Sequence, residues 1–507
     1  MRYSMTFFIL VLVVVVDCVL GFQTNYKHQN DWKYTNHRLQ LTTNPKSNPQ
    51  NLISSDNDLI KIHVAPMQAY TNQHLRHLYS LLNPSVWLWT EMEKTNDLLY
   101  SHDAFHRRLT YESLSITRNP CVLQLGGNDS NQLNQCIRQL DTFHQYYDEI
   151  NLNCGCPSIE TGGANYGAAL MKDPNLIQYL IQSMKDHLPT SMKDIPISIK
   201  IRIAVHDDYH EEHEETYNDL FTFVNQLCQR GRQTYDYPMP IVVHARAAIL
   251  SGLSTSKNRS IPKLHPEFVH QLAHDFPNHR ITLNGGIQSL EQLDQVIHDT
   301  SSHSIPSISK CITTKSKIDG IMIGRWFLKR PLDLLDIYDY MEQYGTNLTH
   351  YLHERNHPPK RNTANDKSIS HLSMSSIQRK VQAIIQYGEY AHKQLMDGIY
   401  SKSDILLPLC LIAFQLQDDI HTIDEYHFDN DEIHTNKSTM YTEEDLLLLQ
   451  HALSEGISCA LTSITNGNKY EKFETGEMLT MRAILKTCQQ TIGKKVFNKI
   501  KRNRNEL

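Results

Sequence analysis

The chain lacks the cysteine patterns that would place it in a class at once. Its ten cysteines are spread over 507 residues without the regular spacing of a disulfide framework, and no paired CxxC motifs have the spacing of a zinc site. This cysteine usage fits a reducing compartment best. We expect no bound metal.

An overall cationic excess is also missing. The formal net charge of -6 gives no general attraction to nucleic acid, so RNA binding requires basic residues gathered on one face. One such group lies at the end of the sequence, where a solvated tail is an equally good interpretation. The group comprises Lys494, Lys495, Lys499, Lys501, Arg502 and Arg504.

The N-terminal apolar run is too short for a comfortable membrane span. A spanning helix needs roughly 20 apolar residues, whereas this run extends only from Phe7 to Val16. Arg2 before it and Val19-Leu20-Gly21 after it are typical of a cleaved signal. We therefore expect no stable membrane association once the presequence is removed.

The stretch that follows is basic. Residues 22–50 contain Asp31 as their single acid and resemble a transit peptide, so residues 1–50 together are similar to the two-part presequences of plastids of secondary endosymbiotic origin. The secretory lumen fits less well, because Asn258-Arg259-Ser260 would be a glycosylation acceptor there. We expect a mostly disordered presequence and residence in an organelle matrix, of plastid or mitochondrion, with the cytoplasm as the alternative.

From residue 58 to 335, short β-rich runs alternate with longer segments of helical periodicity. This alternation predicts βα units. Eight such units make an α/β fold, the TIM or (β/α)8 barrel, whose active site lies at the carboxyl ends of the strands. The predicted strands are Lys61–Pro66, Val86–Glu91, Cys121–Leu125, Glu149–Asn153, Pro196–Ile203, Pro240–Ala245, Arg280–Leu283 and Gly320–Ile323.

Beyond the barrel the pattern is helical. The polar stretch Asn356–Ser370 indicates a linker, and the Ser/Thr-rich stretch Asp299–Lys317 a surface insertion in the barrel. We predict an α-helical bundle domain over residues 371–507, with a disordered insertion near 419–437. Its helices are expected at Ile377–Leu395, Ile405–Leu416, Glu443–Leu461 and Glu477–Ile492.

The segment from Ile150 to Ser158 carries the strongest chemical signal. An apolar strand ends there in a turn that presents two thiols and two amides. Cys156 lies between a glycine and a proline, and an ordinary thiol is mostly protonated near neutral pH, so it can act as a proton donor. A C-x-C metal site is the weaker interpretation, since no histidine cluster accompanies it. A structural role suits Cys154.

Polar residues at other strand ends are ambiguous when taken singly. Gln124 can donate to and accept from a flat heterocycle. Lys200 lies in an apolar strand, where its charge needs an anion, an electron-rich ring or a salt bridge. Asn284-Gly285-Gly286 and Gly324-Arg325 follow successive strands and favour a phosphate cradle over ordinary turns. His244 fits either a ligand contact or a hydrogen-bonded rim residue.

Together these motifs resemble the tRNA-dihydrouridine synthases over about residues 58–335. The loop from Leu250 to Pro262 resembles the A type in particular. The ordered series is Ala65-Pro66-Met67, Cys121-Val122-Leu123-Gln124-Leu125, Gly155-Cys156-Pro157-Ser158, Gly167-Ala168-Ala169-Leu170-Met171, Val243-His244-Ala245-Arg246, and Leu250-Ser251-Gly252-Leu253-Ser254 through Asn258-Arg259 to Ile261-Pro262.

The resemblance implies an FMN-containing enzyme that uses NADPH to reduce a D-loop uridine of tRNA, at positions 20 and 20a in tRNA numbering. Hydride from reduced flavin would reach C6 while Cys156 protonates C5. Asn153, Ser256 and Arg259 match positions that touch tRNA, and Arg246 and Lys257 are cationic candidates in the same loop. The flavin would be held by Pro66, Met67, Gln124, Lys200, His244, Asn284, Gly285, Gly286, Gly324 and Arg325.

The chain departs from the family pattern in places. Tyr70-Thr71-Asn72-Gln73-His74 stands where Trp-Thr-Asp-Arg-His is usual, and Ser256 stands where lysine is frequent. The family's C-terminal Gly-Ala-Arg-x-Trp-Arg motif is not recognisable. Two other functions compete: an FMN oxidoreductase of a free pyrimidine, similar to dihydroorotate dehydrogenase, and a catalytically inactive tRNA-binding protein. The sequence leaves the oligomeric state open.

Overall fold

The computed structural model describes residues 60–505, apart from 101, 110–118, 144, 158–165, 211–213, 230–238, 299–317, 342–374, 429–440 and 462–480. The predicted presequence, the Ser/Thr-rich insertion and the linker lie outside the described residues, so what the sequence predicts for them stays a prediction.

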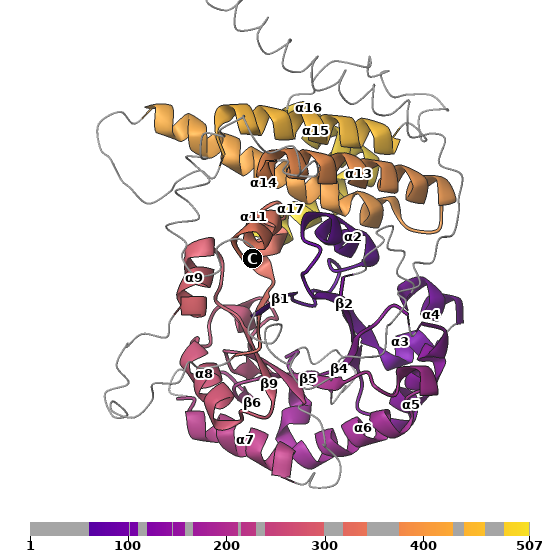
Figure 1. Ribbon diagram of the computed structural model, residues 1–507, viewed down its shortest axis with the longest axis vertical. Coiled ribbons are helices and arrows are strands. Elements are labelled where there is room, and N and C mark those ends of the chain that lie inside the picture. The colour runs from indigo at the N-terminus through magenta and orange to yellow at the C-terminus, as the bar shows by residue number, and fades with distance from the viewer. Residues whose placement is uncertain are drawn as a thin grey trace, which may run out of the picture. The chain divides into compact units, whose positions relative to one another are not determined.

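Eight parallel strands form the barrel (Figure 1), which confirms the predicted fold class. Their order is β1-β10-β9-β7-β5-β4-β3-β2. The ring closes between β1 and β2, where the Val64 amide donates to the Trp87 carbonyl (2.9 Å) and the Trp87 amide to the Ile62 carbonyl (2.9 Å). The strands are β1 (Lys61–Val64), β2 (Leu88–Lys94), β3 (Cys121–Gly126), β4 (Glu149–Asn153), β5 (Ile197–Arg202), β7 (Pro240–His244), β9 (Arg280–Asn284) and β10 (Gly320–Ile323).

The second strand is the one most displaced from its prediction. β2 starts later than Val86 and runs past Glu91, with a register irregularity against β3 between Trp89 and Met92. A bulge bends a strand and re-aims its side chains. Here it includes Glu91 and lies just before Glu93, and both residues border the cavity described below.

Helices surround the strands, and two-residue strands β6 (Val205–His206) and β8 (Ala248–Ile249) pair above the barrel rim. Three of the barrel helices begin at side-chain caps: Asn72 before α2, Asp129 before α5 and Asp173 before α6. The barrel helices are α2 (Gln73–Leu82), α3 (Thr95–Leu99), α4 (His102–Leu109), α5 (Ser130–Gln139), α6 (Pro174–Asp186), α7 (Tyr217–Gln229), α8 (Pro266–Asp275), α9 (Leu290–His298), α10 (Arg325–Lys329) and α11 (Asp333–Asp339), with 3-10 turns η1 (Leu140–Phe143), η2 (Gly167–Lys172), η3 (Thr190–Met192) and η4 (Lys257–Arg259).

Strand parity separates the barrel interior from its outer core. Residues of one parity, such as Leu123, Ile199 and Leu283, pack against the helices. Those of the other parity, including Trp89, Val122 and Val242, form a separate buried cluster. The barrel is therefore filled at its amino-terminal end, and a ligand can enter only from the carboxyl ends of the strands.

In the part of the chain that the structure describes, five helices follow α11, which confirms a helical C-terminal region although four helices were predicted. They are α13 (Ser376–Asp397), α14 (Lys402–Phe428), α15 (Glu443–Leu461), α16 (Met481–Ile492) and α17 (Lys494–Asn505). A capping box at Ser375 and Gln378 starts α13, and Gly398 in the left-handed conformation ends it. α13 packs closely on α15, because a Cβ on Gly388 would lie 2.6 Å from the Cα of Gly456.

One prediction about this region was wrong. The insertion expected from residue 419 is helical as far as Phe428, because Asp419 faces Arg330 of the barrel. The basic group at the end of the sequence lies on α17, whose Phe497 and Ile500 are buried, and both interpretations of that group stay open. Residues 429–437 lie outside the described part.

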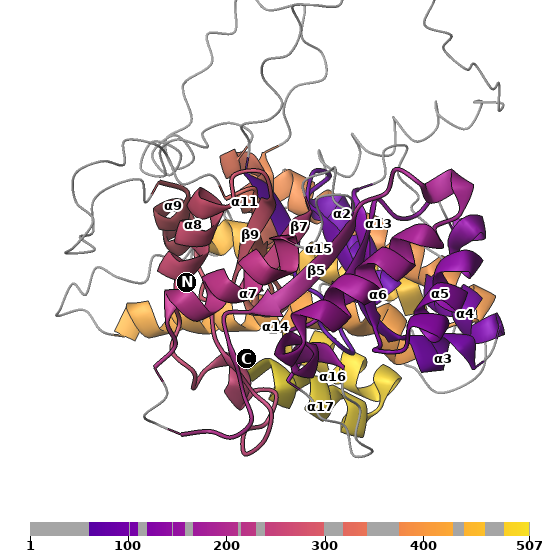
Figure 2. The same ribbon diagram turned by 90° about the horizontal axis from the view of Figure 1, so that it is seen from below.

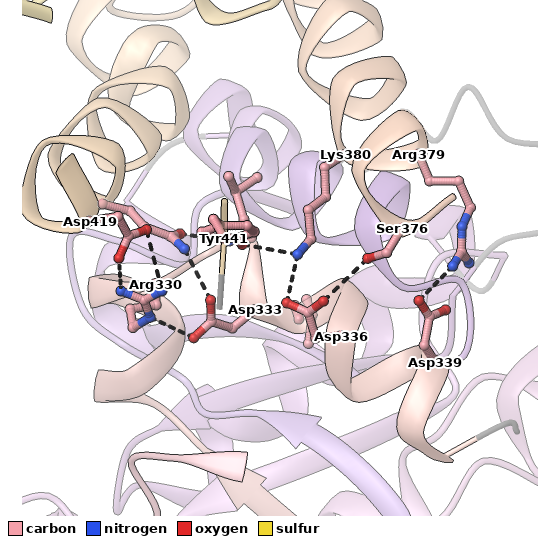
Figure 3. Close-up of polar contacts among 12 residues, drawn as sticks. Arg330, Asp333, Asp336, Asp339, Ser376, Arg379, Lys380, Asp419 and Tyr441 are labelled. Carbon is pink, nitrogen blue, oxygen red and sulfur yellow. Dashed lines mark hydrogen bonds and ion pairs between the residues drawn. The ribbon is translucent and has the colours of Figure 1, made fainter. Parts of the chain in front are cut away.

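Ionic contacts attach the helices to the end of the barrel (Figure 3). Arg330 donates to Asp333 (2.7 Å) and to Asp419 of α14 (2.6 Å). α11 runs past residue 335, the predicted end of the barrel domain, and carries Asp336 and Asp339, which pair with α13. Among the described helices, none is long and apolar enough to span a bilayer.

Candidate active site

A cavity of about 990 Å³ opens at the carboxyl ends of the strands. Cys156 and all ten residues predicted to hold a cofactor border it, together with Asn153 and Arg259. Arg246, Ser256 and Lys257 do not border it. The sequence motifs thus converge in space, although they are spread from Pro66 to Arg325.

Side-chain amides hold the loop that carries Cys156. The Oδ1 atom of Asn153 accepts from the backbone amides of Gly155 (3.2 Å) and Cys156 (3.0 Å). Its Nδ2 atom donates to Gln124 (2.9 Å), which in turn donates to Asn151 (2.8 Å). The turn after β4 is therefore anchored to the barrel interior.

The two thiols of this loop lie in different environments. Cys154 is fully buried, and burial raises the pKa of its thiol. This position agrees with the structural role predicted for it. Cys156 is half-buried at the cavity, and its carbonyl accepts from the Ala168 amide (2.8 Å). A Cβ on Gly167, whose φ is 70°, would lie 2.6 Å from that carbonyl, so only glycine fits there.

Lys200 borders the same cavity as Cys156 and interacts with it electrostatically, without an acid to neutralise the ammonium. Burial, and then the neighbouring Arg202, lower the pKa of the Lys200 ammonium to about 7. Among the described residues no carboxylate pairs with Lys200. The salt-bridge alternative is thus unsupported, and an anion or an electron-rich ring remains as its partner.

His244 lies on the same side. Its Nδ1 atom is buried and has no hydrogen-bond partner among the described residues. Burial and the cations Arg202 and Lys200 lower the pKa of His244 well below its usual value, so the ring is neutral. An unsatisfied buried ring nitrogen indicates a ligand atom at this point, rather than a hydrogen-bonded rim residue.

The glycine motifs leave space for such a ligand. Gly285 and Gly286 have φ values of 106° and 89°, which favour glycine. A Cβ on Gly285 would lie 3.2 Å from His244, and one on Gly324 would lie 3.2 Å from Ala65. Arg325 lies beside them, and its guanidinium donates to the Arg259 carbonyl (3.3 Å).

Four of the RNA-binding candidates, Arg246, Ser256, Lys257 and Arg259, lie in the loop after β7, and they differ in whether they border the cavity. Arg259 borders the cavity, whereas Ser256 and Lys257, at the start of the turn η4, do not. The Arg246 guanidinium donates to the Pro262 carbonyl, so it is used within the loop. Asn258, fully buried, fixes the loop through Ile249.

Arg202 is a site residue that sequence reasoning missed. Its guanidinium is buried and donates to the carbonyls of Gly155 (3.0 Å), Ala247 (3.2 Å) and Asn258 (3.1 Å). It thereby joins the Cys156 loop to the Arg259 loop. The signal available in the sequence was a second basic residue two positions after Lys200.

The opposite side of the cavity is acidic, which was also missed. Glu91 and Glu93 from β2 and Asp404 from α14 border it. Burial, and then the neighbouring Glu93, raise the pKa of Glu91 to about 7. Arg108 pairs with Glu93 (3.2 Å).

The residues present fit FMN. The cavity volume lies at the upper end of the range of ~300–1,000 Å³ for small-ligand sites. Unneutralised Lys200 and the unsatisfied His244 nitrogen suit an anionic, heteroaromatic ligand, and the glycines allow its close approach. No group of three or more His, Cys, Asp or Glu side chains that could hold a metal occurs among the described residues.

Comparison with known proteins agrees with this geometry. The family model for dihydrouridine synthase (Dus) matches residues 63–393. A tRNA-dihydrouridine(20/20a) synthase from Synechocystis sp. is 34% identical over 279 residues, which cover 55% of this chain and 71% of that protein. Two further tRNA-dihydrouridine(20/20a) synthases are also similar. The one from Shewanella oneidensis is 32% identical and the one from Pseudomonas putida 34% identical, each over 274 residues, which cover 54% of this chain and 69% of the relative. Because the match covers more than half of the chain, including Cys156 and the ten predicted flavin residues, the chain belongs to the dihydrouridine synthase family.

Proposed function

We propose that this chain is an FMN-containing, NADPH-dependent tRNA-dihydrouridine synthase of the A type, which reduces uridine to 5,6-dihydrouridine in the D-loop, at positions 20 and 20a. The observation that carries the proposal is the meeting of Cys156, Lys200 and His244 in one cavity at the strand ends. Membership of the family and its tRNA-modifying relatives support the substrate.

The chemistry divides between cofactor and protein. When bound, FMN that has been reduced by NADPH supplies the hydride for C6 of uracil. Lys200, His244, the two glycine motifs and Arg325 would hold the flavin. Cys156 gives the proton from its Sγ atom to C5, and Asn153 keeps that thiol at the cavity by binding the loop amides.

The uridine must leave the stacked tRNA to reach the cavity, at a cost of a few kcal/mol. Contacts elsewhere on the tRNA have to offset that cost, and we assign them in part to α17. Lys494, Lys495 and Lys499 are exposed on it, and its sequence KKVFNKIKRNRN contains no acid. Cations on one face bind the phosphate backbone without regard to sequence.

α17 is connected to the cavity through α14. Phe497 packs on Phe414, with 5.2 Å between ring centroids, and Figure 2 shows α16 and α17 together beside α14. Asp404, at the start of α14, borders the cavity. Ten residues of helix separate it from Phe414, or roughly 15 Å at 1.5 Å per residue. A tRNA whose uridine enters the cavity can span that distance.

The test is to incubate the purified protein with FMN, NADPH and unmodified tRNA, and to map dihydrouridine by nucleoside mass analysis. We expect product in the D-loop. Cys156→Ala should slow its formation by about 10²- to 10⁴-fold, with flavin still bound. Cys228→Ala, a half-buried thiol on α7, is the matched control and should retain activity. Equal turnover in both variants would contradict the role of Cys156.

Two competing functions predict different results. An oxidoreductase of free pyrimidines would reduce uracil or orotate and ignore tRNA. A catalytically inactive tRNA-binding protein would bind tRNA without oxidising NADPH. The unneutralised Lys200 and the fitted flavin cavity favour an active enzyme over the latter.

For the cellular site we propose an organelle matrix, on the composition of residues 1–50. A fluorescent fusion of the full chain should colocalise with a plastid or mitochondrial marker, and a diffuse cytoplasmic signal would contradict this. Stable membrane association is not expected after removal of the presequence.

A further inference from the structure

The cavity is not closed by the barrel alone. Ile399, Tyr400, Ser401 and Asp404, from the turn between α13 and α14 and the first turn of α14, form part of its wall. Within the described chain, this is where the C-terminal helices meet the cavity. A ligand that occupies this side therefore touches both regions of the protein.

The turn is held firmly in place. The Tyr400 ring lies edge-on to His74 of α2, with centroids 4.9 Å apart at 80°. His74 is hydrogen-bonded to the Tyr390 hydroxyl (2.9 Å), and His77 stacks on Tyr390 at 3.9 Å. The wall is thus preorganised by aromatic packing between α2 and α13, which reduces the entropy cost of binding.

One side chain of this rigid turn is apolar and faces solvent. Ile399 is 61% exposed. Next to it the half-buried ring of Tyr400 borders the same cavity. Flat bases stack on aromatic and apolar surfaces of this kind.

Charge decides which part of an RNA can lie here. Arg259, the RNA-binding candidate that borders the cavity, lies on the barrel side and attracts phosphate. Glu91 and Asp404 are on the wall side; Gln68 donates to Glu91 (3.0 Å), and Asp404 is exposed. The exposed Asp404 carboxylate repels phosphate but accepts hydrogen bonds from the N–H groups of bases. The wall therefore suits a nucleobase, and the RNA backbone belongs on the other side.

We propose that Ile399, Tyr400 and Asp404 form a second base-binding wall, which holds a nucleobase of the tRNA adjacent to the reacting uridine and favours a base that carries N–H donors. The inference rests on the proposed function and deepens it. The wall contributes to the choice of uridine, because a uridine flanked by an unsuitable base loses these contacts while the cavity itself is unchanged.

The test compares two double variants of the full-length protein. Ile399→Ser/Asp404→Asn alters the wall. Met396→Ser/Asp397→Asn is the matched control, since Met396 is 64% exposed and neither residue borders the cavity. All four side chains are exposed, so neither variant should unfold. Binding of unmodified tRNA is measured by fluorescence anisotropy, and the KM for NADPH is measured in parallel.

We expect the wall variant to weaken tRNA binding about tenfold, within the range for loss of one stacked base, and the control to change it less than about twofold. Transcripts with each base in turn on either side of the target uridine should reveal a preference in the wild type that the wall variant loses. Unchanged tRNA affinity in the wall variant would overturn the inference. If the KM for NADPH rose at the same time, the wall would border the NADPH site instead.

Failure of the proposed function gives a different result. A protein that makes no dihydrouridine can still be examined by anisotropy, and equal tRNA affinity of the two variants would then overturn the wall as well. Retained catalysis together with equal affinity and no flanking-base preference would overturn the wall alone.

Discussion

The ammonium of Lys380 lies 2.6 Å from the carboxylate of Asp336, and the two side chains are 0% and 1% exposed. The pair joins α13 to α11, the last described helix of the barrel (Figure 3). Tyr441 accepts a second hydrogen bond from Lys380 (2.9 Å). Desolvation cancels much of the attraction in such a buried pair, so its main effect is to fix one orientation of the helices on the barrel.

Removal of one partner from this pair should be costly. Lys380→Met leaves the Asp336 carboxylate buried without its cation, and we expect a loss of about 3–5 kcal/mol in the free energy of unfolding. Urea unfolding followed by circular dichroism measures it. Lys61→Met is the control, because Lys61 and its partner Asp319 are 33% and 26% exposed; it should lose about 1 kcal/mol or less. Equal losses of unfolding free energy in the two variants would contradict the view that the buried Lys380–Asp336 pair is the more costly one to break.

Asn153 should act on the rate rather than on binding. Asn153→Ala removes the acceptor that holds the amides of Gly155 and Cys156, and a small displacement of the thiol should lower kcat about 10- to 100-fold. The KM for tRNA should change little. Asn153→Asp keeps the acceptor and should recover part of the rate. A raised KM with normal kcat would instead indicate that Asn153 binds RNA directly.

Lys200 should link flavin binding to pH. Burial lowers the pKa of its ammonium to about 7 in the absence of an anion, and an anionic ligand raises it again. Binding therefore takes up a proton above pH 7, and the affinity for FMN falls as the pH rises from 7 to 9. Fluorescence titrations of the apoprotein measure this slope. In Lys200→Met the slope should be reduced, and identical slopes would contradict the assignment.

Much of the barrel follows from local sequence signals. β4 and β10 begin and end as predicted, because each is a short apolar run bounded by turn-forming or polar residues. β2 differs because its bulge depends on pairing with β3. The helical continuation through Asp419 depends on Arg330, 89 positions earlier in the chain. Such long-range pairs have no local signature.

The candidate site likewise contains residues that the sequence predicted and residues that it did not. Cys156 and the predicted flavin residues border one cavity because parallel strands bring their carboxyl ends together. Their chemical roles stay predictions until they are tested. Arg202 was missed because its partners are backbone carbonyls of two loops that are distant in the sequence. The acidic wall was missed because Asp404 comes from a helix that no barrel motif includes.

The basic face of α17 should determine how tRNA affinity depends on salt. Each lysine that neutralises a phosphate contributes about one unit to the slope of log K against log salt concentration. Lys495→Gln/Lys499→Gln should therefore reduce the slope by about two and weaken binding to all tRNAs alike. Lys185→Gln/Lys193→Gln is the matched control, since these residues precede β5 at the closed end of the barrel. Filter binding between 50 and 200 mM salt, a range over which such contacts change affinity greatly, measures both. If the two variants have equal slopes, α17 is a solvated helix, and the tRNA contacts that offset the extrusion of uridine lie elsewhere.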